Sequence, residues 1–372
     1  MDQRSNKKLQ SRHFMRGMSL PEILAAVLIG LIGMVVIMQV YATSEERKRT
    51  TTGTSDAQIN GNIAMFTLES AMRSAGFGMV SAAFNMLGCT TSAYNSNRPT
   101  PDFTFLMAPV VITVGAGGAP DKITVAYGSS PNVVEGLAFV GGAASGADFP
   151  LKNAAGIQVG DLVVASETGL NCSLAEVTGF VPAAINTVQH PNGLAYSYVD
   201  ASGNTISPTA SYNKVGGSGV AYTTAALLFT LGRAPTVMTY QIGNDKLQTK
   251  TLMPYVPAQD ADGDGTSDAD VGDGIVQLKA LYGKDMDGDA VVETWNTTLP
   301  ATDVQWMQVR VIRVALLARS AKFEKTAVTA AAPTWSGGAF TMTNPADGTD
   351  WRFYRYRVYE TVVPLRNMIW SN

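Results

Sequence analysis

The 372-residue sequence is poor in the side chains on which most enzymes and metalloproteins depend. It has two histidines, His13 and His190, and two cysteines, Cys89 and Cys172. These residues provide neither a Cys/His zinc cage nor a dense disulfide scaffold. Charged residues make up only 15% of the chain and the formal net charge is −3. This balance argues against a nucleic-acid-binding protein, which would carry a basic face.

Catalytic motifs are also scarce. His190 precedes Pro191-Asn192-Gly193, which is typical of a turn, and we expect a surface histidine there. The segment Gly216–Gly219 is not a Gly-x-Ser-x-Gly elbow, and the sequence contains no P-loop. The sequence therefore predicts no enzymatic activity.

At the N-terminus a basic segment is followed by a long uncharged, apolar segment. Residues 1–17 contain five basic residues and one acid, whereas the 22 residues from Ile23 to Ser44 carry no charge. At about 1.5 Å per residue, a helix of that length crosses a hydrocarbon core of about 30 Å. The leader contains more basic residues than the segment Glu45–Arg49. We therefore expect the leader to stay in the cytoplasm and the rest of the chain to lie on the other side of the membrane.

Glu22 stands directly before this apolar run. A carboxylate in the membrane costs several kcal/mol unless it is neutral or paired, which makes Glu22 a candidate functional residue. The alternative is a glutamate at the level of the lipid headgroups that needs no partner. An ordinary secretory signal would have a shorter apolar core followed by a cleavage site of small residues, for which Ala42-Thr43-Ser44 is available.

The segment Arg16–Glu22, with the sequence RGMSLPE, resembles the type III leader of type IV prepilins. The resemblance implies that a prepilin peptidase cuts between Gly17 and Met18 and methylates Met18, which stands where the family usually has Phe. Glu22 would become the fifth residue of the mature chain and act in assembly by attracting the N-terminal amine of a neighbouring subunit. Removal of the leader takes away five of the 27 basic residues and one of the 30 acids, which leaves a formal charge of −7.

Several downstream blocks resemble PilW-type minor pilins, whereas residues 90–260 match nothing recognisable. The resemblance implies a minor pilin that takes part in initiation and assembly of a type IV pilus. Its partners would be other minor and major pilins, the prepilin peptidase and the inner membrane, with no nucleic acid. The ectodomain would lie first in the periplasm and then at the pilus or cell surface. The blocks are Arg73–Phe77, Asp273–Gly283, Trp306 with Val309–Ser320, and Val362–Asn367.

The expected fold is α+β and pilin-like. It has a cleaved leader (1–17), a long N-terminal helix (18–80) that includes a transmembrane segment (23–44), and a mostly antiparallel β-rich domain (81–372) with insertions. Residues 130–215 are the expected insertion, and the Thr- and Gly-containing segment 50–54 predicts a break in the helix. Two adjacent apolar stripes suit a helix that lies on a sheet. They are Ile59, Ile63 and Phe66, and Met65, Leu68, Met72 and Ala75.

Acidic residues gather between 260 and 270. Asp260, Asp262 and Asp264 fit positions 1, 3 and 5 of a calcium loop, with the Thr266 carbonyl at position 7 and Asp268 at position 9. Position 12 is a valine, so another acid would have to replace the usual bidentate Glu. We expect calcium here, and the alternative is a solvated acidic hairpin.

A second acidic cluster repeats this spacing with Asp285, Asp287, Asp289 and Glu293. An alanine replaces the turn glycine, and alanine resists positive φ. Lys284 is adjacent and is expected to neutralise part of the charge. Two interpretations of this cluster stay open, a calcium site and a plain turn.

Cys89 and Cys172 lie outside the cytoplasm on this topology, so we expect them to form a disulfide in the oxidising periplasm. Two separate buried thiols are the alternative. Two other functions also stay open. One is a minor pseudopilin of a type II secretion system, and the other is a membrane-anchored calcium-dependent adhesin that binds through residues 90–260.

The leader predicts a specific N-terminus for the mature chain. Mass spectrometry of protein extracted from membranes should find methylated Met18 as the first residue, because the motif places the cut directly after Gly17. A chain that begins at Ala42, Thr43 or Ser44 would instead identify an ordinary secreted protein.

Overall fold

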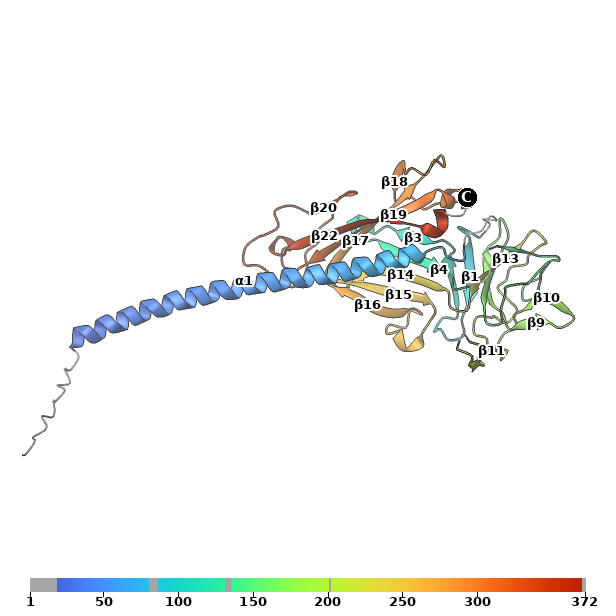
Figure 1. The fold of residues 1–372 in the computed structure, drawn as a ribbon, viewed down its shortest axis with the longest axis horizontal. Coiled ribbons are helices and arrows are strands. Elements are labelled where there is room, and N and C mark those ends of the chain that lie inside the picture. Colours follow the sequence, from blue (N-terminus) through green and yellow to red (C-terminus); the bar gives the residue numbers. More distant parts are fainter. Residues whose placement is uncertain (1–18, 80–85, 131–134, 201, 370–372) are drawn as a thin grey trace, which may run out of the picture. The chain divides into compact units, whose positions relative to one another are not determined.

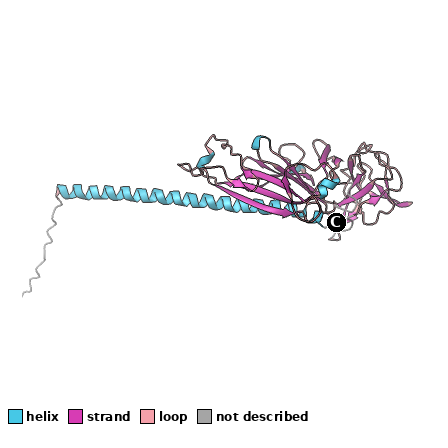
Figure 2. Ribbon diagram, turned by 90° about the horizontal axis from the view of Figure 1, so that it is seen from above, coloured by secondary structure: helices cyan, strands magenta, loops and turns pink. Residues whose placement is uncertain are grey.

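The structure, a computed structural model, describes residues 19–79, 86–130, 135–200 and 202–369. Gly17 and Met18 of the predicted cleavage site lie outside these residues. The chain divides into two compact units, residues 1–53 and 54–372. A long apolar helix is followed by several mostly antiparallel sheets, which confirms the predicted α+β, pilin-like fold (Figures 1 and 2).

Helix α1 runs from Leu20 to Ser74. Its first part, Leu20–Glu45, is apolar enough to cross a membrane, with a mean hydropathy of 2.7. The helix is continuous through residues 50–54, so the predicted break there is wrong. Threonine and glycine each weaken a helix by about 1 kcal/mol or less, which is not enough to stop a helix that is extended cooperatively on both sides. The boundary between the two compact units nevertheless falls at Gly53.

In the second unit, one face of α1 lies in the core. Of the two predicted stripes, the one that contains Leu68, Met72 and Ala75 is fully buried. The other stripe faces solvent, and its side chains are 54% (Ile59), 50% (Ile63) and 72% (Phe66) exposed. The helix therefore packs on the sheets through a narrower face than the sequence predicts.

Two antiparallel sheets share this core with α1. One has the strand order β16-β15-β14-β4-β3, and the other has the order β18-β17-β19-β22. The strands of the first are β3 (Val110–Thr113), β4 (Lys122–Tyr127), β14 (Thr236–Gly243), β15 (Lys246–Met253) and β16 (Ser267–Asp273). Those of the second are β17 (Ile275–Lys284), β18 (Thr294–Asn296), β19 (Val309–Arg319) and β22 (Tyr356–Pro364).

A six-stranded sheet with the order β2-β1-β8-β7-β13-β5 contains part of the predicted insertion. A second hydrophobic cluster is built within residues 139–228. Two strands connect the insertion to the rest of the unit, because β7 pairs with β13 and β8 pairs with β1. Other short strands of the insertion form a three-stranded and a two-stranded sheet of their own. The strands are β1 (Thr90–Tyr94), β2 (Asp102–Leu106), β5 (Leu137–Ala138), β7 (Leu162–Ser166), β8 (Cys172–Glu176) and β13 (Leu227–Gly232).

The remaining elements are short. They are strands β6 (Phe149–Pro150), β9 (Gly179–Val181), β10 (Ala184–Gln189), β11 (Tyr198–Val199), β12 (Thr205–Ile206), β20 (Thr334–Trp335) and β21 (Gly338–Ala339), and helices α2 (Asp303–Met307) and α3 (Arg366–Ile369). Three 3-10 turns complete the set: η1 (Ala116–Gly118), η2 (Pro257–Gln259) and η3 (Trp351–Phe353).

The predicted disulfide between Cys89 and Cys172 is confirmed, with a Cα–Cα distance of 5.9 Å. It connects the residue before β1 to the first residue of β8 across 83 positions of sequence. Closing a loop of that length stabilises the fold by about 4–5 kcal/mol in the chain-entropy model. The bond fixes one edge of the inserted region to the strand that follows α1.

Tyr359 of β22 packs on α1 at Gly61, where a Cβ atom would overlap the tyrosine ring. The ring cannot easily turn away, because its hydroxyl lies 3.1 Å from the carbonyl oxygen of Gln58 and donates to it. Beyond the other end of β22, Asn367 of α3 donates to the carbonyls of Ser74 and Ala75. The last strand therefore follows the helix from residue 57 to residue 75.

The Gly61→Ala substitution should lower the melting temperature, although alanine is the better helix former. The added methyl group overpacks the contact with Tyr359, at a cost of about 1–3 kcal/mol, which exceeds the gain in helix propensity of about 1 kcal/mol. Thermal unfolding of the full chain in detergent, followed by circular dichroism, measures the difference. Asn62→Ala, on the exposed side of the same turn, is the matched control and should not destabilise the chain. Equal melting temperatures for both variants would contradict the contact.

Candidate functional site

Besides the disulfide of Cys89 and Cys172, the predicted site residues in the described part of the chain are Glu22 and the two acidic loops; His190, predicted to be a surface residue without a catalytic role, lies there as well. The first acidic loop, residues 260–268, lies between β15 and β16 and includes the first two residues of β16. The second acidic loop, residues 285–293, joins β17 to β18.

Glu22 lies in the first turn of α1. Its Oε2 accepts hydrogen bonds from the backbone N of Ser19 at 3.1 Å and from the Oγ of Ser19 at 3.2 Å. The backbone N of Glu22 donates to the Ser19 carbonyl at 2.9 Å. This is one half of a capping box, in which a glutamate at the third helical position reaches back to the residue that caps the helix. The carboxylate thus has a partner within the isolated chain.

The first acidic loop is held by hydrogen bonds from its own backbone. Asp260 accepts from the amides of Gly263 and Gly265 at 2.8 and 3.0 Å. Asp262 accepts from the amide of Asp264 at 3.2 Å. Oxygen atoms of these three aspartates lie within 4.8 Å of one another. The group could hold a metal ion, as the sequence predicts.

Lys250 of β15 already neutralises much of this loop. Its Nζ lies 2.8 Å from the Oδ2 atoms of Asp262 and Asp264 and 3.1 Å from Oδ1 of Asp268. Burial opposes the charge of Lys250, but the three ion pairs outweigh it and raise the pKa of its ammonium. Asp268 is bound to Lys250 and does not join the three-aspartate group.

Arg98 supports the same loop from the side. Its Nε donates to the carbonyl of Gly265 at 2.9 Å, and its guanidinium stacks on Phe103 at 4.1 Å from the ring centre. Two cationic side chains, Lys250 and Arg98, therefore bind the first acidic loop.

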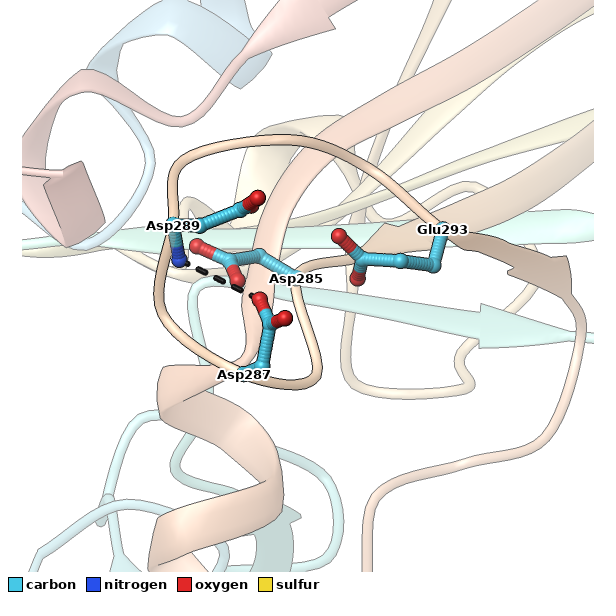
Figure 3. Close-up of side chains that lie close together, drawn as sticks. All are labelled: Asp285, Asp287, Asp289 and Glu293. Atoms are coloured by element: carbon cyan, nitrogen blue, oxygen red, sulfur yellow. Dashed lines mark hydrogen bonds between the residues drawn. The ribbon is translucent and has the colours of Figure 1, made fainter.

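The second acidic loop repeats the backbone pattern of the first. Asp285 accepts from the amides of Gly288 and Ala290 at 2.6 and 3.1 Å. Asp287 accepts from the amide of Asp289 at 3.3 Å. In Figure 3 the carboxylates of this loop converge inside its curve. Oxygen atoms of all four predicted acids, Asp285, Asp287, Asp289 and Glu293, lie within 4.8 Å of one another.

The charges around the second loop differ from the prediction. Lys284 does not neutralise it, because its Nζ donates to the carbonyl of Thr298 at 3.0 Å. Arg310 instead lies 3.3 Å from Oδ2 of Asp285. Ala290 has the unfavourable positive φ of +68° at the position of the turn glycine. The loop keeps the hydrogen-bond pattern of the first acidic loop despite that residue.

Both loops favour ionised acids. Burial raises the pKa of Asp260, but hydrogen bonds from Tyr255, Gly265 and Gly263 outweigh it and lower that pKa below its usual value. Burial likewise opposes the ionisation of Asp285, and the amides of its own loop again lower its pKa. These carboxylates contribute stability above the ordinary pKa of Asp, and the contribution is lost as the pH falls through the lowered pKa.

His190 is partly buried rather than a surface residue. Its Nε2 lies 2.9 Å from the carbonyl oxygen of Ala147, and its ring centre lies 4.2 Å from that of Phe149. Burial lowers the pKa of the imidazole, so it is neutral at pH 7. The histidine packs against an aromatic ring and bonds to the backbone, which is a structural role.

Residues 239–367 match the family model of the type IV pilus-assembly protein W, PilW. The match covers about a third of the chain and runs from β14 to α3. It contains both acidic loops and the sheet that packs on α1. No curated protein and no solved structure matches the chain. The C-terminal region therefore contains a PilW domain, as the sequence blocks predict.

Proposed function

We propose that this chain is a minor pilin that takes part in the initiation and assembly of a type IV pilus. The observation that carries the proposal is the combination of two features on one chain. A prepilin-type leader precedes an apolar helix long enough to cross a membrane, and the C-terminal region matches PilW. The PilW family is one of structural pilus-assembly proteins, so no enzymatic activity is proposed.

Assembly is proposed to depend on an exchange of partners by Glu22. In the isolated chain the carboxylate caps its own helix through Ser19. Cleavage before Met18 would create an N-terminal amine on each subunit. In the membrane this amine would pair with Glu22 of a neighbouring subunit and set the helices one step apart. A desolvated ion pair of this kind is better suited to fix register than to add stability.

Substitution of Glu22 by Ala should leave cleavage and folding of the ectodomain intact but reduce incorporation into filaments. The reason is that the peptidase needs chiefly Gly17 and the basic leader, whereas the pairing needs the carboxylate. Pilus yield and the amount of this chain in sheared filaments measure the effect, with the variant as the sole copy. Glu45→Ala, at the other end of the apolar segment, is the control and should assemble normally.

Normal piliation with Glu22→Ala would remove the proposed role of this residue. Normal piliation together with loss of protein secretion would instead favour the alternative function, a pseudopilin of a type II secretion system. The PilW match favours the pilus over this alternative and over a calcium-dependent adhesin.

Calcium is the proposed ligand of the second acidic loop. Calcium takes six to eight oxygen ligands from carboxylates and carbonyls, and four carboxylates converge there. The first acidic loop carries the same backbone pattern, but Lys250 occupies three of its carboxylates. Arg310 pairs with Asp285 alone, and bound calcium would supply the positive charge for the other acids of the second loop and would order the β17–β18 connection.

Calcium should raise the melting temperature of the full chain, by an amount equivalent to about 2.7 kcal/mol at a hundredfold excess over Kd. Magnesium should act less, because it is reluctant to lose its water and requires octahedral geometry. The pair Asp287→Asn and Asp289→Asn should abolish the shift. The matched pair Asp262→Asn and Asp264→Asn, in the first loop, should keep it. A melting temperature that ignores millimolar calcium would show that both loops are plain turns.

A further inference from the structure

The connection from β19 to β22 forms an aromatic flap, residues 320–355. Its place in the globular unit follows from the strand register. Arg319 pairs with Tyr356 at the end of the β19–β22 ladder, and Tyr359 bonds to the carbonyl of Gln58. The flap therefore lies at the end of the unit where the chain enters from the apolar helix, opposite β9 and β10 (Figure 1).

The flap carries aromatic side chains that are only partly buried. Phe323 stacks on Phe353 at 5.1 Å and meets Tyr354 edge-on at 5.9 Å, yet 51% of its surface is exposed. The guanidinium carbon of Arg352 lies over the ring of Trp351, 4.9 Å from its centre. Phe340, by contrast, is buried on the outer face of the sheet and anchors the flap. The flap is thus fixed to the domain while part of its aromatic surface faces solvent.

The exposed ammonium groups of the flap lie next to its exposed ring in sequence. Two of its three acids, Glu324 and Asp350, are paired with Arg355 at 2.8 Å and with Arg352 at 3.2 Å. The third, Asp347, is exposed and accepts hydrogen bonds from the backbone N and the hydroxyl of Thr349. Lys322 and Lys325 are exposed, and no acid among the described residues pairs with either of them. They flank Phe323 and Glu324 in sequence. The segment 322–325, referred to as the tip, combines an exposed ring with two free ammonium groups on a chain that is acidic as a whole.

We propose that this tip, residues 322–325, rests on the anionic headgroup layer of the membrane that anchors the chain, before the subunit enters a filament. Aromatic rings settle at the interface between water and hydrocarbon, and lysines nearby are attracted to anionic lipids. Residues 46–56 separate the apolar segment from the start of the β22 contact, which as helix amounts to about 17 Å. The tip would hold the ectodomain near the membrane surface.

The proposal rests on the membrane anchoring in the proposed function, and the two can be tested apart. The mature full chain is reconstituted into vesicles of phosphatidylglycerol and phosphatidylcholine, and flotation with the vesicles tests the anchor alone. The tip is tested with Phe323→Trp, whose fluorescence reports lipid contact through a blue shift and quenching by brominated lipids. Val215→Trp is the control, because Val215 is 78% exposed and lies in the insertion.

We expect quenching of Phe323→Trp above the wild-type background and none for Val215→Trp. The added variant Lys322→Glu with Lys325→Glu should remove the quenching, as should vesicles of phosphatidylcholine alone or 1 M salt, which screens charge beyond about 3 Å. Equal quenching at positions 323 and 215 in chains that float would overturn the proposal while leaving the anchor intact.

A second measurement needs no substitution near the tip. Trypsin should cut the wild-type chain after Lys322 and Lys325 more slowly in anionic vesicles than in an uncharged detergent. Cleavage after Lys152, an exposed lysine of the insertion, should be the same in both. Equal rates at the flap in vesicles and in detergent would also contradict the proposal.

Discussion

Helix α1 is one continuous helix, but its two parts lie in different environments. In Leu20–Glu45 the apolar side chains point outward in all directions and are covered by no other part of the described protein. From Ala57 to Ala75 a single face is buried and sheets cover it. The hydrophobic effect therefore favours transfer of the first part from water into lipid, whereas it stabilises the second part through burial in the domain itself. Both the fold and the proposed assembly depend on this division.

The contact between helix and sheet determines where the other parts can be attached. Gly61 lets the ring of Tyr359 approach the helix axis, and Ala64 approaches the β16–β17 turn near Gly272. The last strand then runs alongside the helix, which leaves the acidic loops and the flap at the ends of strands. The disulfide joins the inserted region to the strand that follows the helix.

Features that depend on composition or local spacing could be predicted from the sequence: the apolar span, the α+β fold, the disulfide and the convergence of the acids. Features that depend on strand pairing could not. Lys250 reaches the first acidic loop because β15 places it opposite Asp268, a register that the spacing of the acids does not reveal. Lys284 is next to the second loop in sequence but bonds elsewhere. Likewise, helical spacing located two apolar stripes on α1 without indicating which of them the sheets would cover.

The place of the apolar helix in a filament can be measured by site-specific photo-crosslinking in cells. A photoreactive amino acid at Leu31, which is exposed in the middle of the span, reports what surrounds the helix. Filaments sheared from these cells should contain this chain cross-linked to the helices of other pilins. A chain recovered only from membranes, with cross-links to lipid alone, would contradict its assignment to the pilus.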